Sequence, residues 1–235
     1  MGKIEEHRAA LKGLADWLPY LNDHSGLPGP RGNLELVAAC GEEADVPRAE
    51  QLIATGDEFA TVCGVVALGR YLGLHPADRR HVEVLRRHAA DSRWRVREGV
   101  AMAVQRAGDD DPELAFALAE SWGHDPDPLV RRAAVAAVCE PRLLRTQAAA
   151  RRALELLDGV TGDLARLPEA DRRSPSVRTL RQALGYGWSV AIAALPAEGL
   201  RIFAELEANS DPDIAWIVRE NSKKKRLRKL LDGSP

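Results

Sequence analysis

Histidines and cysteines are the first candidates for binding a metal ion, and their spacing predicts no metal site. His81 and His88 lie seven residues apart on an expected helix, and the other four histidines are scattered. Helical zinc sites place two histidines four residues apart, as in H-E-x-x-H, and no such pair occurs. Cys40, Cys63 and Cys139 form no C-x-x-C pair, which excludes a zinc knuckle and a redox motif. We therefore expect no metal, with surface histidines and reduced cysteines packed in a core.

Sequence patterns typical of catalysis and nucleotide binding are also absent. The chain has no G-x-S-x-G turn for a serine nucleophile, and no G-x-x-x-x-G-K-[ST] or G-x-G-x-x-G loop for phosphates. Asp109, Asp110 and Asp111 form a carboxylate cluster, but Pro112 follows them directly at an expected helix start. Carboxylates there are stabilised by the helix dipole, so we interpret the cluster as capping residues. The sequence predicts no catalytic residues and no cofactor.

The densest charge in the chain is a basic run near its C-terminal end. The run consists of Lys223, Lys224, Lys225, Arg226, Arg228 and Lys229. Leu227, Leu230 and Leu231 are spaced so that the segment docks as an amphipathic helix. Two interpretations stay open: a solvated basic face, or a patch that contacts the phosphates of a nucleic acid. The formal net charge of the whole chain is −2, which gives no global attraction for nucleic acids or acidic membranes.

The composition indicates helices as the elements that position these side chains. Hydrophobic residues make up 45% and charged residues 29%, and alanine, leucine and arginine, which favour helices, are abundant. The N-terminal segment MGKIEEHRAALKGL contains acidic residues and no apolar run, so we expect no signal peptide. No uncharged apolar stretch reaches the roughly 20 residues that a membrane span needs. We expect a cytoplasmic protein with no membrane partner.

An internal repeat organises the middle of the chain. Three segments begin at Asp57, Asp91 and Asp125, each 34 residues after the one before. Apolar and often small residues recur five, eight, nine and twelve positions after each aspartate, which traces one face of a helix. The aspartates are predicted to cap these helices, and the small residues to let neighbouring helices approach closely.

These segments resemble HEAT repeats, in which an A helix and a turn with aspartate precede a B helix that begins with Val-Arg. DSRWRVREGVAMAV (91–104) and DPDPLVRRAAVAAV (125–138) carry the resemblance best. The resemblance implies an all-α, right-handed α-solenoid that forms a single HEAT-like repeat domain over residues 1–235. The clearest repeats are expected at 47–72, 77–107 and 112–139, and diverged ones at 146–231, with A helices at 47–54, 77–89 and 112–122.

The connecting segments fit the same architecture. The Pro- and Gly-rich segment 25–33 is expected to form a loop between an N-terminal helix and a helix that starts near Leu34. A helix is expected over 146–158, then a loop with a short helix over 159–175. A further helix over 176–195 contains Gly185 and Gly187, which are expected to loosen it.

The curvature of such a solenoid implies a concave surface lined by the B helices, where a protein or peptide partner is the first expectation. Arg97 and Arg131 each lie six residues after a repeat aspartate, and are expected either to form a ladder to the adjacent repeat or to be solvated. The predicted binding residues are Trp94, Arg95, Arg97, Arg131, Arg132, Tyr186, Trp188, Lys223, Lys224, Lys225 and Arg226.

A second resemblance supports a nucleic acid as the alternative partner. WGHDPDPLVRRAA (122–134) and LRQALGYGW (180–188) are similar to two stretches of bacterial alkylpurine DNA glycosylases, which are built from HEAT-like repeats. The resemblance places Tyr186 where that family has the tryptophan of its damaged-base cleft, with Trp188 two residues on. The family's catalytic aspartate is not matched, because PELAFALAESW (112–122) offers only Glu113 and Glu120. The alternative function is therefore DNA binding related to base-excision repair.

Overall fold

The computed structural model describes residues 2–233, which contain helices and no strand. The chain divides into two compact units, Met1–Leu114 and Ala115–Pro235, with the boundary inside α8 (Pro112–Gly123). The prediction of a single repeat domain over the whole chain stays a prediction. Each unit has its own helical core, and the two are described separately.

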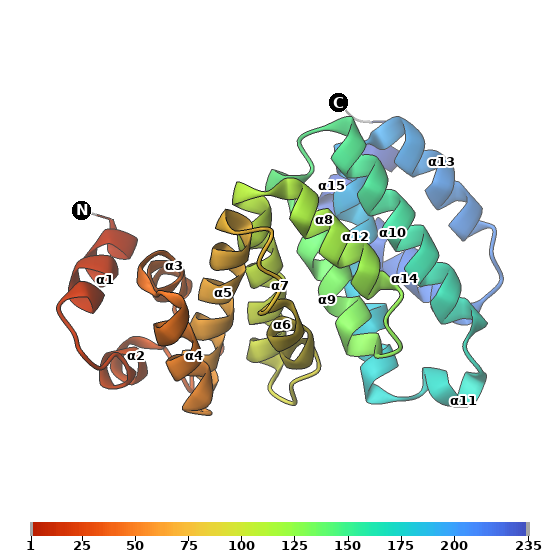
Figure 1. Cartoon of the computed structure of the whole chain (residues 1–235). Coiled ribbons are helices and arrows are strands. Elements are labelled where there is room, and N and C mark those ends of the chain that lie inside the picture. The colour runs from red at the N-terminus through yellow and green to blue at the C-terminus, as the bar shows by residue number, and fades with distance from the viewer. Residues whose placement is uncertain (1, 234–235) are drawn as a thin grey trace. The chain divides into compact units, whose positions relative to one another are not determined.

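Unit 1 is organised around one central helix, α5 (Figure 1). Thirteen of the 17 residues of α5 are buried, because α3, α4 and α7 pack against it and α2 and α6 also touch it. A helix that is apolar all round is typical of such a central position. The helices of unit 1 before α8 are α1 (Lys3–Lys12), α2 (Leu18–His24), α3 (Leu34–Glu43), α4 (Val46–Ala54), α5 (Glu58–Leu74), α6 (Val82–Ala89) and α7 (Trp94–Asp110).

Small residues bring α5 and α7 close together, as the repeat pattern predicts. Gly69 and Ala103 both stand twelve positions after their repeat aspartate, and a Cβ atom on Gly69 would overlap the backbone of Ala103. One turn further on, a Cβ atom on Gly73 would lie 2.7 Å from the carbonyl oxygen of Ala107. The two helices therefore meet backbone to backbone.

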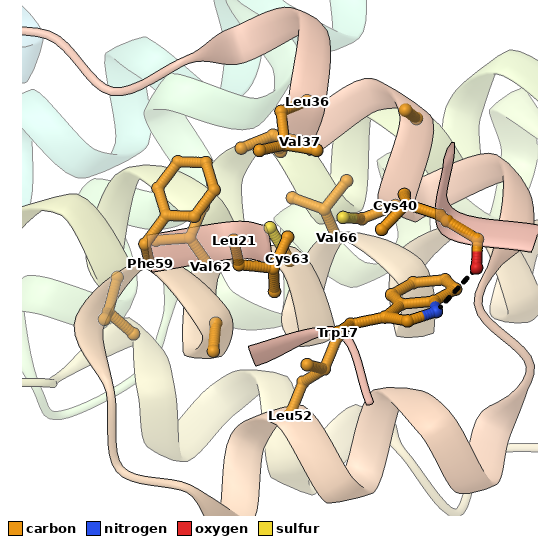
Figure 2. Close-up of a cluster of buried hydrophobic side chains, with 14 residues drawn as sticks. Trp17, Leu21, Leu36, Val37, Cys40, Leu52, Phe59, Val62, Cys63 and Val66 are labelled. Carbon is orange, nitrogen blue, oxygen red and sulfur yellow. Dashed lines mark hydrogen bonds between the residues drawn. The ribbon is translucent and has the colours of Figure 1, made fainter. Parts of the chain in front are cut away.

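The core of unit 1 also holds the N-terminal helices (Figure 2). Trp17 is buried and its indole N–H donates to the carbonyl oxygen of Leu11 at 3.0 Å, which ties the α1–α2 turn to the core. Cys40 on α3 and Cys63 on α5 lie in the same cluster. Both cysteines have no exposed surface, which confirms their predicted place in a core.

The three thiols are expected to be unreactive in the folded protein. Burial raises the pKa of Cys139 to about 12 and raises the pKa of Cys63, so neither forms the thiolate that attacks a disulfide reagent at neutral pH. We expect no thiol to react with a chromogenic disulfide within minutes, and three thiols to react after unfolding in guanidinium. Rapid titration of one thiol in the native protein would contradict the packing of these helices.

Unit 2 is built around α12 (Pro175–Ala194), which packs against α9, α10 and α14 and also against α13 and α15. Proline stands in the first turn of α9, α12, α13 and α14, where its missing N–H costs no helical hydrogen bond. The other elements of unit 2 are α9 (Pro128–Val138), η1 (Pro141–Leu143), α10 (Gln147–Arg166), α11 (Glu169–Arg172), α13 (Pro196–Glu207), α14 (Pro212–Ser222) and α15 (Lys225–Leu231).

Glycine proved a poor guide to helix ends in unit 2. The loop predicted over 159–175 is wrong in its first half, because α10 continues through Gly159 and Gly162 to Arg166. Val160 and Leu164 are buried and extend the apolar face of α10, which outweighs the low helix propensity of the two glycines.

In unit 1, the helix predicted over 77–89 is shorter than expected, because α6 begins only at Val82.

The repeat aspartates cap their helices in only part of the chain. Asp57 accepts from the backbone N–H of Ala60 and caps α5, as predicted. Asp91 and Asp125 each accept from the backbone N–H two residues on, at 2.8 and 2.9 Å, and the helices begin later. Asp127 instead caps α9. Asp91 and Asp125 therefore form the turn before the helix, since an aspartate side chain can also bond to the backbone two residues on.

Candidate partner-binding groove and basic patch

A groove of about 580 Å³ opens on the surface of unit 1. It is formed by the loop after α2 and by one side each of α3, α5 and α7. Its lining is Pro30, Arg31, Gly32, Leu34, Glu35, Val37, Phe59, Val62, Trp94, Arg95, Glu98 and Met102.

Two large apolar side chains of this groove are exposed. Trp94, the first residue of α7, has 50% of its surface exposed, and Leu34, the first residue of α3, has 60%. Phe59 and Val62 of α5 are buried beneath and form part of the lining. Water in contact with such apolar surface is released when a ligand covers it, so the groove favours an apolar ligand group.

Arg95 holds the wall of the groove in place. Its guanidinium donates to the carbonyl oxygen of Gly29 at 2.9 Å and to the carboxylate of Glu58 at 3.2 Å, and stacks on the ring of Trp94 with 4.6 Å to the centroid. Arg95 thereby connects the loop after α2, the start of α5 and the start of α7. Arg95, one of the predicted binding residues, thus positions the ring of Trp94.

The Pro- and Gly-rich segment 25–33 forms a defined wall. Gly26 has a φ of +76°, which favours glycine, and its carbonyl oxygen accepts from Gly29. Asn33 closes the loop by donating its backbone N–H to Ser25, while its side chain caps α3. The sequence predicts a loop between two helices here but not a binding surface. Leu34 and Met102 carry no motif either, so the sequence offered no signal for the groove as a whole.

Arg97 and Arg131 occupy equivalent positions and make equivalent bonds. Each donates to the carbonyl oxygen of its own repeat aspartate, Asp91 for Arg97 and Asp125 for Arg131. Arg131 also lies 4.0 Å from the carboxylate of Asp163 on α10. Each arginine therefore bonds within its own repeat, and Arg131 also reaches an aspartate of the following helix, as a ladder between repeats requires. Arg93, which donates to the carbonyl oxygen of Gly56, adds a further connection between repeats.

Two of the predicted binding residues are buried in unit 2. Trp188 has no exposed surface, and its indole N–H donates to the hydroxyl oxygen of Thr161 at 3.1 Å. Arg132 is 9% exposed. The prediction of Trp188 as a contact residue is therefore wrong, because Trp188 faces the core of unit 2. The neighbouring Gly187 is packed as tightly, since a Cβ atom on it would lie 2.9 Å from the sulfur of Cys139.

Tyr186 is exposed and lies beside the basic run. Its exposed fraction is 45%, and its hydroxyl accepts from Arg226 at 2.8 Å. Two cations lie over the ring of Tyr186: the Nζ of Lys224 is 5.4 Å from the ring centroid, and the guanidinium carbon of Arg226 is 5.1 Å from it. The structure thus brings Tyr186, Lys224 and Arg226 together, although about 40 residues separate them in sequence.

The basic run folds into α15 and the turn before it. Leu227 is fully buried and docks α15, as its spacing predicts, against α12 and α14. Lys223 donates to Glu220 at 2.7 Å, and this hydrogen bond lowers the pKa of Glu220, which stays ionised. Lys223 is therefore the one member of the run that forms an ion pair with a carboxylate among residues 2–233. We call Tyr186, Lys224, Lys225, Arg226, Arg228 and Lys229 the basic patch.

Neither unit offers a metal site or a membrane span within the residues that the structure describes. No group of three or more histidine, cysteine, aspartate or glutamate side chains is arranged to hold a metal ion there. No helix between residues 2 and 233 is both long enough and apolar enough to cross a bilayer.

Comparison with known proteins identifies the repeats. Residues 41–139 match the family model described as HEAT repeats. The match contains the pairs α4–α5, α6–α7 and α8–α9, which are the three clearest predicted repeats. The predictions of HEAT-like repeats in this part of the chain and of an all-α, solenoid-type fold are thereby confirmed, while the diverged repeats over 146–231 stay a prediction. No curated protein and no solved structure gave a significant match to the chain.

Proposed function

We propose that this HEAT-repeat protein is a binding scaffold whose groove in unit 1 takes a peptide segment of a protein partner. The observation that supports the proposal is the half-exposed ring of Trp94 over a groove with an apolar floor. Tryptophan is the residue type most often found to dominate the energy of protein interfaces. A large apolar side chain of the partner occupies the groove, between Trp94 and Leu34.

The shape of the site favours a peptide over a small cofactor. Pockets for small molecules bury most of the surface of the ligand. Here the two residues at the rim, Trp94 and Leu34, are at least half exposed, so a ligand would stay open to solvent on one side. Arg31 and Glu35 at the rim provide charges of both signs for polar contacts around the apolar anchor.

DNA binding in the manner of alkylpurine DNA glycosylases has less support. Arg95 and Arg131 face carboxylates, and Trp188 is buried. Glu120, one of the two acids in the stretch that would carry catalysis, is bonded to Arg152 at 2.6 Å. The similarity to those enzymes stays a prediction, as does a cytoplasmic location.

Truncation of Trp94 tests the proposed function. Peptides are selected from a random display library on the full chain, and the dissociation constant of the best one is measured by fluorescence polarisation for each variant. We expect Trp94→Ala to weaken binding about 10- to 100-fold, because the variant loses the largest exposed apolar surface of the groove.

Tyr186→Ala is the matched control, since it removes an aromatic ring of similar exposure from unit 2. The selected peptides should carry a large apolar residue, and Tyr186→Ala should bind them like the unchanged protein. Equal binding by Trp94→Ala and the unchanged protein would overturn the proposal.

A further inference from the structure

The C-terminal segment has a charge opposite to that of the rest of the chain. Residues 219–232 contain seven lysines and arginines and two acidic residues, whereas the whole chain has a net charge of −2. The carboxylate of Glu220 forms ion pairs with Lys223 and, at 3.7 Å, with Arg219. Lys225, Arg228 and Lys229, in contrast, form no ion pair with any carboxylate in residues 2–233. These three side chains are exposed and their charges repel one another, so a multivalent anion would stabilise the patch.

The packing of α12 and α14 fixes the position of Tyr186 within the patch. A Cβ atom on Gly185 would lie 2.7 Å from the ring of Trp216 on α14, so the absence of a side chain there allows the two helices to approach. Asn221 of α14 bonds to α12 at Leu184 and Ser189, on either side of Tyr186. Tyr186 is therefore presented on a rigid helix, directly beside the cations that follow α14.

The chemistry of the patch combines one aromatic ring with several cations. Lysine and arginine contact phosphates, and an exposed aromatic ring stacks on an unpaired base. Lys224 and Arg226 lie against the ring of Tyr186. A base stacked on that ring would displace one of them, and the released cation would then be free to bind the adjacent phosphate. The patch thus offers a site for both parts of a nucleotide.

Two other anionic partners fit the patch less well. Insertion into a membrane requires an apolar face, but Leu227 is buried and Leu230 is partly buried against unit 2, which leaves only Leu231 exposed among the leucines of α15. An acidic peptide would satisfy the cations but would make no use of the ring of Tyr186, which would stay against Lys224 and Arg226.

We propose that the basic patch binds single-stranded nucleic acid, with the lysines and arginines on the phosphates and Tyr186 against a base. This site lies within unit 2 and is independent of the peptide groove in unit 1.

Fluorescence anisotropy with labelled twelve-nucleotide oligo(dT) and oligo(U) tests the proposal on the full chain. Neutralisation of about four phosphates predicts that affinity falls about 50-fold between 50 and 200 mM salt. The triple variant Lys225→Gln, Arg228→Gln, Lys229→Gln should lose most of this salt dependence. Tyr186→Ala should weaken binding about tenfold at either salt concentration, and Tyr186→Phe, which keeps the ring, should restore most of the affinity.

Competitors and a groove variant make the outcome specific. A duplex of the same length, polyglutamate and phosphatidylserine vesicles should all compete less well than the single strand, and Trp94→Ala should bind the oligonucleotide normally. Competition by polyglutamate or vesicles as strong as by the single strand would overturn the proposal. Unchanged binding by Tyr186→Ala, or no binding at 50 mM salt, would overturn it as well.

Discussion

Replacing Gly69 by alanine is expected to destabilise unit 1 by about 3 kcal/mol, at the upper end of what one added methyl group costs in a packed core. The new Cβ atom would overlap the backbone of Ala103, which cannot rotate away as a side chain can. The helices α5 and α7 must separate, and the contacts along both are weakened. Guanidinium unfolding followed by far-ultraviolet circular dichroism and tryptophan fluorescence measures the change, with each unit fitted by its own transition.

Gly159→Ala is the matched control for the Gly69 prediction. Gly159 lies in α10 and is exposed, and a methyl group added there would meet no atom within 4 Å. Alanine is the better helix former, so this substitution should stabilise unit 2 by about 0.5 to 1 kcal/mol. If Gly69→Ala also raised stability, the close contact of α5 and α7 would be wrong.

Replacing Asn221 by alanine is expected to destabilise unit 2 by about 3 kcal/mol. Asn221 is fully buried, accepts from the backbone N–H of Ser189 at 2.8 Å, and donates to the carbonyl oxygens of Leu184 and Ile217. The variant leaves a buried N–H without its partner and creates a cavity, and each of these costs about 1 to 3 kcal/mol. Thermal and guanidinium unfolding give the size of the effect.

Gln182→Ala provides the comparison for Asn221, because Gln182 is an exposed amide on α12 of the same unit. Its replacement should change stability by less than about 0.5 kcal/mol. Asn221→Ala should also weaken oligonucleotide binding, since its bonds hold α12 and α14 together around Tyr186. Equal stability of the two variants would contradict the assigned hydrogen bonds.

The repeat segments were predictable because their periodicity reflects helix packing directly. Gly69 and Ala103 occur at the same offset from Asp57 and Asp91, and they meet in the structure as that offset predicts. The role of Asp91 in the turn was not predictable, because an aspartate before a helix can either cap it or form the preceding turn. Which occurs depends on Arg93, which donates to Asp91 from its backbone and its side chain.

The candidate sites were predictable only in part. The basic run is visible in the sequence, but the position of Tyr186 beside it follows only from the packing of α15 on α12. Tyr186 and Trp188 look equivalent in sequence, yet one is 45% exposed and the other is buried, because they are two residues apart on one helix. The groove depends on the loop wall at Pro30 to Gly32, which has no periodic signal.

The indole N–H signals of the five tryptophans, in a ¹⁵N-correlated NMR spectrum recorded with a selected peptide, test the central claim most directly. Assignment follows from single Trp→Phe variants. Binding in the groove predicts that the Trp94 signal shifts in proportion to occupancy, while the signals of the buried Trp122 and Trp188 stay in place. A saturating peptide that leaves the Trp94 signal unmoved and shifts that of Trp216 instead would contradict the groove as the binding site.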